Sequence, residues 1–190
     1  MSLLRRLLAG NLPRPSAILR RLEDAVARAP LDRISRLRAR GVTIGERCAI
    51  LSDGFSTEPY LITIGDHVGI SSGVELVTHH GVAWLLRERH PSIQAFGTIR
   101  IGDDSFIGMN SILLPGTDIG RRCIIGAGSV VSGKVPDGSV FAGRPARLVK
   151  TTEETLGAIL VHPNRLDLYD TPEPERRARL LAHFGLEAPP

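Results

Sequence analysis

An aliphatic residue returns at every sixth position through most of the middle of the chain. The runs are Ile44 and Ile50, then Ile64, Ile70 and Leu76, then Ile101, Ile107, Leu113, Ile119, Ile125 and Val131. A six-residue period fits neither the repeat of an α-helix nor the two-residue alternation of a long strand. Short fixed periods are typical of solenoids, in which each repeat packs only against its neighbours. The period therefore predicts an all-β solenoid of short strands and tight turns, with three repeats in each triangular coil.

A second column of small or branched residues accompanies the first. Its members lie four positions after an aliphatic residue: Val68, Val74, Ser105, Ser111, Thr117, Cys123, Ser129 and Val135. Glycine often follows the aliphatic residue, and we expect glycine, Asn or Asp at corners, where the backbone needs positive φ. Aromatic residues make up only 4% of the chain, whereas 20 residues are glycine. Each buried Ile or Val contributes about 1.5–3 kcal/mol, so single coils are weak and a stack is stable.

The repeat occupies residues 42–150, and the segments on either side have a helical pattern. In the N-terminal segment, 1–41, apolar residues recur at helical spacing up to Gly41, with a break at Pro30. This pattern predicts two short amphipathic helices or one kinked helix. The C-terminal segment, 151–190, contains PEPERRARLLAHFGL. It predicts a short helix that begins after Thr171 and ends at Gly185.

The repeat stops once, within the stretch VELVTHHGVAWLLRERHP at 74–91. Because the period resumes at Ile101, residues 79–97 are predicted to form a loop inserted in the coil. Two adjacent histidines, His79 and His80, stand at its start. An ordinary imidazole, with a pKa of about 6.5, is well suited to act as a general base. The insertion is therefore the first candidate for a functional site.

Charge and cysteine content narrow the possible partners and compartment. The net charge is +4 and the sequence pI about 9.7, but no aromatic residues alternate with the arginines, so nucleic acid is not an expected partner. No apolar run reaches the length of about 18 residues that a membrane span needs. Arg5 and Arg6 cut the N-terminal apolar run, so no signal peptide is expected either. Cys48 and Cys123 form no CxxC pair, which favours the cytoplasm.

The long regular run resembles a known group of enzymes. IGDDSFIGMNSILLPGTDIGRRCIIGAGSVVSGKVPDGSVFAGRPARLV is similar to the hexapeptide-repeat acyltransferases, and its second half is especially specific to them. EPYLITIGDHVGISSGVELVTHHG, followed by WLLR, resembles their sugar and polysaccharide O-acetyltransferase branch. The likeness covers about residues 42–150. It implies a left-handed parallel β-helix, a homotrimer with active sites between subunits, acetyl-CoA as acyl donor, and a loop histidine as base.

The resemblance assigns the base to His79, which matches the histidine of the family's T-H-D motif. Here His80 replaces the acid of that motif, so the hydrogen-bond surroundings of the base differ. Glu58 precedes His79 by 21 positions, slightly more than one coil, so both can lie near one corner. A carboxylate there would orient the imidazole or bind acceptor hydroxyls, unless it is an ordinary solvated turn residue. His80 is the base if the loop register differs by one, and otherwise a turn residue or an acceptor contact.

Other side chains are candidates for binding the two substrates. Asp53, Tyr60 and Trp84 are candidates for acceptor contacts, although either ring can simply anchor the loop. The resemblance places the acyl-CoA groove at Gly108, Met109, Gly126, Ala127, Gly128 and Ser132. Small residues permit close approach there, and the amide of Met109 or Ala127 would bind an oxyanion or the pantetheine arm. The cations expected near CoA phosphates, with plain surface charge as the alternative, are Lys134, Arg144, Arg147 and Lys150.

The sequence thus predicts an acetyl-CoA-dependent O-acetyltransferase, without a metal, that acts on a hydroxyl of a sugar or polysaccharide precursor. An N-acetyltransferase acting on an amino sugar or a xenobiotic is an alternative, because the base requirement is similar. A non-catalytic repeat protein is another. The zinc carbonic anhydrases of the same fold need three well-placed histidines and usually an HGC element. This chain has HHGV instead, which disfavours them.

Overall fold

The computed structural model describes residues 33–168 and 170–187 of the chain. Its contacts form two compact units, one up to Thr152 and one from Glu153 onward. Helix α3 (Arg33–Ala39) ends just before Gly41, whose φ of +96° turns the chain toward the first strand. The rest of the predicted N-terminal helical pattern lies outside the described residues. None of the described helices is both long enough and apolar enough to cross a bilayer.

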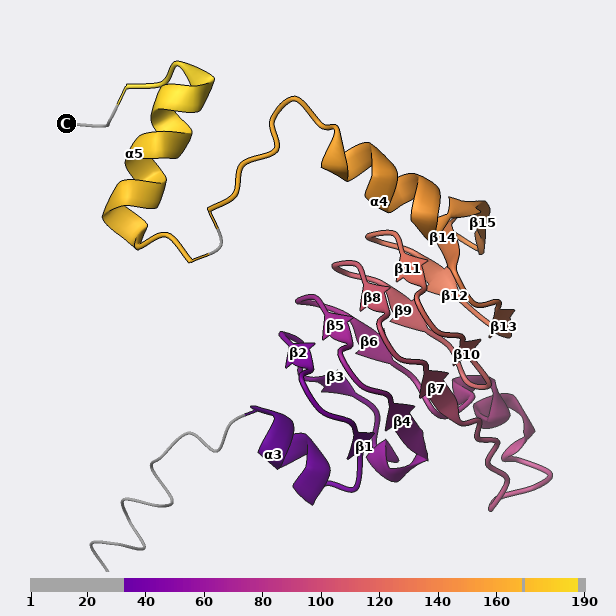
Figure 1. Cartoon of the computed structure of the whole chain (residues 1–190). Coiled ribbons are helices and arrows are strands. Elements are labelled where there is room, and N and C mark those ends of the chain that lie inside the picture. The colour runs from indigo at the N-terminus through magenta and orange to yellow at the C-terminus, as the bar shows by residue number, and fades with distance from the viewer. Residues whose placement is uncertain (1–32, 169, 188–190) are drawn as a thin grey trace, which may run out of the picture. The chain divides into compact units, whose positions relative to one another are not determined.

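The first unit is a stack of short strands that form three faces. The first face contains β1 (Thr43–Ile44), β4 (Ile62–Ile64), β7 (Ile99–Ile101), β10 (Asp118–Ile119) and β13 (Lys134–Val135). The second face contains β2 (Ala49–Ile50), β5 (Gly69–Ile70), β8 (Phe106–Ile107), β11 (Ile124–Ile125), β14 (Ser139–Gly143) and β15 (Ala146–Thr151). The third face contains β3 (Gly54–Phe55), β6 (Glu75–Leu76), β9 (Ile112–Leu113) and β12 (Val130–Val131). Since each face takes every third strand, with β15 as an added strand at the end, the chain winds as a three-sided parallel β-helix (Figure 1).

The six-residue columns predicted from the sequence form the core of this coil. All the aliphatic residues of the predicted runs are buried, from Ile44 at 7% exposure to Leu113 at 0%. Strand pairing keeps them in register, so that Ile64 lies beside Ile101 and Ile101 beside Ile119. The aliphatic side chains therefore stack as continuous columns inside the coil, and each rung buries its neighbours.

The second column is buried as well, and its hydroxyl groups bond to the backbone. Ser105 donates a hydrogen bond of 3.0 Å to the carbonyl of Gly120, and Ser111 donates one of 3.0 Å to Gly126. In both pairs the acceptor lies at a corner of the next coil. Small hydroxyl residues thus satisfy buried carbonyl groups at turns, a role that an aliphatic residue could not fill.

Glycine serves two separate purposes at the corners. Three positions after an aliphatic residue the backbone is left-handed, as at Gly73, Gly116 and Gly128, which agrees with the expected need for positive φ. The same conformation occurs at Arg47, His67, Asp104, Asn110 and Arg122. The glycine directly after an aliphatic residue has a different reason, because a Cβ at Gly102 would lie 2.6 Å from the carbonyl of Gly120. Close approach between coils, and not φ, selects glycine at that position.

The coil ends in a hairpin, and the second unit is helical. Strand β14 pairs in parallel with β11 and antiparallel with β15. Helix α4 (Thr152–Leu160) continues the chain into the second unit, which also contains α5 (Glu173–Phe184). Helix α5 follows Pro172 and ends at Gly185, with φ of +63°. This is the helix predicted from the C-terminal pattern, terminated by a left-handed glycine.

Candidate active site

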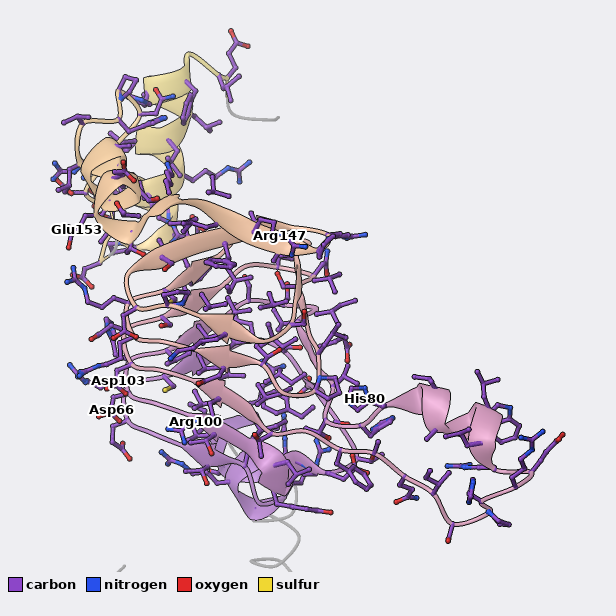
Figure 2. The ribbon with its side chains drawn as sticks, turned by 90° about the vertical axis from the view of Figure 1, so that its right-hand side faces the viewer. Asp66, His80, Arg100, Asp103, Arg147 and Glu153 are labelled. Carbon is purple, nitrogen blue, oxygen red and sulfur yellow. The ribbon has the colours of Figure 1, made fainter. Side chains whose placement is uncertain are left out.

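The interruption in the repeat is a loop that leaves the coil and returns to it. His79 and Phe96 form an isolated antiparallel bridge at its base. The amide of His80 donates to the carbonyl of Ala95, and the amide of Gly97 donates to the carbonyl of Thr78, both over 2.8 Å. Beyond this bridge the loop carries the 3₁₀ helix η2 (Gly81–Leu86). In Figure 2 the loop projects from the coil just past His80. The hydrogen bonds between the two ends of the loop fix His79 at the rim of the coil.

An irregular turn on the preceding coil brings Glu58 to the same corner. Thr43 pairs with Thr63, a step of 20 residues, whereas Arg100 pairs with Asp118, a step of 18. The longer step accommodates the 3₁₀ helix η1 (Pro59–Leu61), and Glu58 lies directly before it. The carboxylate consequently faces the start of the inserted loop on the next coil.

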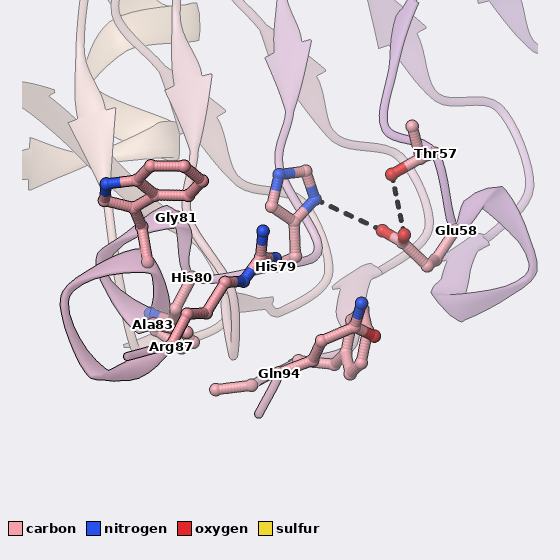
Figure 3. A pocket seen from close by; sticks show the side chains of 11 residues that line it. Thr57, Glu58, His79, His80, Gly81, Ala83, Arg87 and Gln94 are labelled. Carbon is pink, nitrogen blue, oxygen red and sulfur yellow. Dashed lines mark hydrogen bonds and ion pairs between the residues drawn. The ribbon is translucent and has the colours of Figure 1, made fainter. Parts of the chain in front are cut away.

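Glu58 and His79 contact each other within a small hydrogen-bond network (Figure 3). Nδ1 of His79 lies 3.2 Å from Oε2 of Glu58 and 3.2 Å from Oγ of Ser56. Thr78, which is fully buried, donates to Oε2 of Glu58 over 2.9 Å. Thr57 donates to Oε1 over 2.6 Å. Both carboxylate oxygens are therefore held in place, and one of them faces the imidazole.

These contacts determine the ionisation of Glu58 and the orientation of His79. The hydrogen bond from Thr57 is the main cause that lowers the pKa of Glu58 below its ordinary value of 4.5, with further contributions from Thr78 and His79. An ionised carboxylate only accepts hydrogen bonds, so it favours the tautomer with the proton on Nδ1. Nε2 then carries the lone pair, and it bonds to none of the described residues. This arrangement leaves Nε2 free to accept a proton.

The lowered pKa of Glu58 gives the stability of the protein a specific acid dependence. Because folding lowers this pKa, the stabilisation is complete above about pH 4.5 and is lost as the pH falls through the lower folded value. We expect Glu58→Gln to unfold with a shallower pH dependence than the parent below about pH 4.5. Thermal unfolding measured at a series of acidic pH values tests this. Asp53 and Asp104, whose pKa values are also lowered, titrate in both proteins. The prediction therefore concerns the difference between the two unfolding profiles, and identical profiles would contradict it.

A cavity of about 300 Å³ opens beside the His79–Glu58 pair. Its lining comes from the irregular turn and from both ends of the inserted loop: Thr57, Glu58, His79, His80, Gly81, Ala83, Trp84, Arg87, Gln94, Ala95 and Phe96. The structure thus brings together four of the predicted catalytic and acceptor residues.

The other two acceptor candidates lie elsewhere. Asp53 forms an ion pair with Arg33 of α3, with Nε 2.9 Å from Oδ1, and this hydrogen bond lowers the pKa of Asp53. Tyr60 is exposed and packs beside Gly41, where a Cβ would lie 3.0 Å from Cβ of Tyr60. Neither lines the cavity. Sequence reasoning also missed Ser56, Thr57 and Thr78, for which the available signal was a run of hydroxyl residues next to the two predicted catalytic positions.

The residues predicted to bind acyl-CoA lie at two corners of the coil and on its last strand. Gly108 and Met109 follow β8, and Gly126 and Ala127 follow β11, at the corner between the second and third faces. Ser132 lies between the third and first faces, which is the corner of His79, but on a later coil, and Lys134 begins β13 of the first face. Arg147 and Lys150 lie on β15. None of these residues lines the cavity beside His79.

Two backbone amides at the corner between the second and third faces have no backbone acceptor among the described residues. The amides of Gly108 and Gly126 are used, because they donate to carbonyls of the next coil over 2.8 Å. The following amides, of Met109 and Ala127, donate to no backbone carbonyl among the described residues. Nε of Arg144 donates to the carbonyl of Gly128 over 2.6 Å, which fixes a cation next to this corner. Met109 and Ala127 are thus exposed residues at equivalent positions of successive coils, and their amides have no described backbone acceptor.

Comparison with known proteins places the chain in a family. Residues 98–133 match the family described as bacterial transferase hexapeptide (six repeats). Over 121 residues, which are 62% of this chain, it is 47% identical to Protein CapG of Staphylococcus aureus and covers 70% of that protein. It is 39% identical to the galactoside O-acetyltransferase of Escherichia coli over 94 residues, 49% of this chain, and spans 45% of that enzyme's length.

A solved structure shares the coil. The hexapeptide-repeat acetyltransferase of Vibrio cholerae aligns with a TM-score of 0.53 and 25% identity, over 65% of this chain and 83% of that one. Its fold agrees with the three-faced coil described above. Together with the extended match to Protein CapG, this similarity shows that the chain belongs to the hexapeptide-repeat transferases and is an acyltransferase of that family.

Proposed function

We propose that this enzyme transfers an acetyl group from acetyl-CoA to a hydroxyl of a sugar or polysaccharide precursor, with His79 as the general base. The observation that carries the proposal is the imidazole of His79, which lines the cavity, is held through Nδ1 by Glu58 and has no bond at Nε2 among the described residues. A left-handed sense of coiling, which the resemblance implies, belongs to the same proposal. The similarity to an enzyme named galactoside O-acetyltransferase supports a sugar hydroxyl as acceptor.

The residues of the chain suit the proton transfer that esterification requires. Acetyl-CoA would supply the acyl group as a thioester. Nε2 of His79 takes the proton from the acceptor hydroxyl as its oxygen becomes the nucleophile, and later returns a proton to the leaving group. Glu58 holds the Nδ1 proton and stabilises the positive charge on the ring. The amides of Met109 and Ala127 are suited to donate hydrogen bonds to a negative acyl oxygen or to the carbonyl groups of the pantetheine arm.

The separation of the two sets of candidates favours a site shared between subunits. His79 and the amides of Met109 and Ala127 lie at different corners of the β-helix, so a single copy does not bring the base and these amides into one cavity. We therefore propose a homotrimer in which His79 of one subunit faces the corner of the next subunit that carries Met109 and Ala127. The CoA phosphates would bind to the positively charged side chains of Lys134, Arg144, Arg147 and Lys150. We place the reaction in the cytoplasm, where acetyl-CoA is available.

The proposal is tested by measuring thiol release from acetyl-CoA in the presence of different acceptors. We expect release that depends on a glycoside, a nucleotide sugar or a capsule fragment, and a product whose acetyl group is removed by mild base, as an ester is. A base-resistant product formed only with amino sugars would show N-acetylation instead. Absence of acceptor-dependent release across the whole panel, from protein that is folded and assembled, would contradict the proposal.

A further inference from the structure

We infer that the acceptor sugar carries an acidic group, a carboxylate or a phosphate, and that Arg87 of the inserted loop binds it. The inference rests on the proposed function, because it concerns the acceptor of the same site. Arg87 lines the cavity that His79 and Glu58 line. In Figure 3 its side chain extends toward the imidazole of His79. A group bound to Arg87 would therefore lie on the same molecule as a hydroxyl that reaches His79.

The local backbone presents Arg87 together with an aromatic ring. Arg87 caps η2, and its amide donates to the carbonyl of Trp84 over 3.2 Å. In a 3₁₀ helix, side chains three residues apart lie one above the other. The guanidinium carbon accordingly lies 5.6 Å from the centre of the Trp84 ring. A guanidinium that lies over an aromatic ring can still bind an anion through the N–H groups at its edge.

No described residue bonds to those N–H groups of Arg87. Within the described part of the chain it forms neither an ion pair nor a side-chain hydrogen bond, and Glu88 beside it forms no ion pair with it. Arg165 and Arg176, by contrast, pair with nearby carboxylates. An arginine that lines a cavity and keeps its bidentate edge free is arranged as carboxylate- and phosphate-binding arginines are.

The charge balance of the cavity points the same way. Apart from Arg87, Glu58 is the only one of the described lining residues with a full charge at neutral pH. That carboxylate already accepts hydrogen bonds from Thr57 and Thr78 and faces His79. The uncommitted charge is therefore positive. It favours an anionic acceptor over a neutral one.

The remaining lining is suited to a sugar ring. Trp84 and Phe96 are 68% and 46% exposed and both line the cavity, so each ring has apolar surface available to a ligand. Their rings, with Ala83 and Ala95, give the cavity apolar walls. A ligand pocket with apolar walls and a few convergent polar groups is the usual arrangement for small molecules. An acidic monosaccharide unit, with its ring on Trp84 and its charge on Arg87, would use all of these features.

Binding can be measured without any acetyl transfer, because Trp84 is the only tryptophan of the chain. Its fluorescence is titrated with methyl glucuronide, methyl galacturonide and glucose 1-phosphate, and with the matching neutral methyl glycosides. We expect an acidic sugar to bind at least about tenfold more tightly than its neutral counterpart. A charge-assisted hydrogen bond typically contributes enough for a factor of about 10–100. The uronide and phosphate arms distinguish which acid the cavity prefers.

Two substitutions assign the preference to Arg87. We expect Arg87→Gln to reduce affinity for the acidic sugar by about 10–100-fold, with a loss at least about tenfold greater than for the neutral sugar. Arg89→Gln is the matched control, because Arg89 is an exposed arginine of the same loop that does not line the cavity. It should bind both sugars as the parent does. Equal losses in the two variants would overturn the inference, as would equal binding of acidic and neutral sugars by the parent.

Acetyl-transfer assays with the same sugars separate this inference from the proposed function. Acetylation of neutral glycosides in preference to acidic ones would overturn the inference while the O-acetyltransferase function stands. Binding of acidic sugars through Arg87 without transfer to any acceptor would support the ligand class and contradict the function. Preferred acetylation of an acidic sugar that is lost selectively in Arg87→Gln supports both.

Discussion

Replacing His79 by alanine is expected to lower the turnover of acetyl transfer by a factor of about 10²–10⁴. The substitution removes the nitrogen that takes the proton of the acceptor hydroxyl and leaves Glu58 with its bonds from Thr57 and Thr78. The side chain of His79 is 44% exposed, so its loss leaves no large cavity in the core. Steady-state kinetics at saturating acetyl-CoA, with circular dichroism and thermal unfolding of the same samples, test the prediction. The variant should still fold and bind CoA.

His80→Ala is the matched control for this experiment. His80 also lines the cavity, but its side chain makes no hydrogen bond to Glu58 among the described residues. We expect its loss to reduce turnover much less than the loss of His79. A fully active His79→Ala enzyme would refute the assignment of the base. If His80→Ala alone abolished turnover, the base would be His80, the alternative that the sequence left open.

The regular part of the fold could be predicted because burial leaves a periodic record in the sequence. Ile101 to Val131 are buried at every sixth position, since each inward residue must meet the one below it. The spacing does not record why a corner residue is chosen. Gly102 lacks a Cβ that would clash with the next coil, whereas Gly116 allows a left-handed turn. Both are simply glycine in the sequence. Coil-to-coil distance and backbone angles are set in three dimensions.

The candidate site could be predicted only in part for a similar reason. Spacing and resemblance together pointed to His79 and Glu58, and the structure places them 3.2 Å apart. The partners Ser56, Thr57 and Thr78 depend on side-chain rotamers around an irregular turn, and no period describes those. Asp53 forms an ion pair with Arg33 from a helix outside the repeat, so its partner could not be predicted from positions within the repeat. Sequence patterns record which face a residue takes, whereas hydrogen bonds depend on details within one turn.

Ile119→Ala is expected to destabilise the fold by about 2–5 kcal/mol, the usual cost of removing a large buried aliphatic side chain. Ile119 is 1% exposed and lies in register between Ile101 and Val135. Backbone hydrogen bonds hold the neighbouring rungs on both sides, so the coil cannot collapse to fill the cavity. Denaturant unfolding at one fixed protein concentration measures the loss. The control is Asp118→Ala on the same strand, whose outward side chain is 53% exposed. It should change stability by no more than about 0.5 kcal/mol, and similar losses in both variants would contradict a core built from one inward residue per rung.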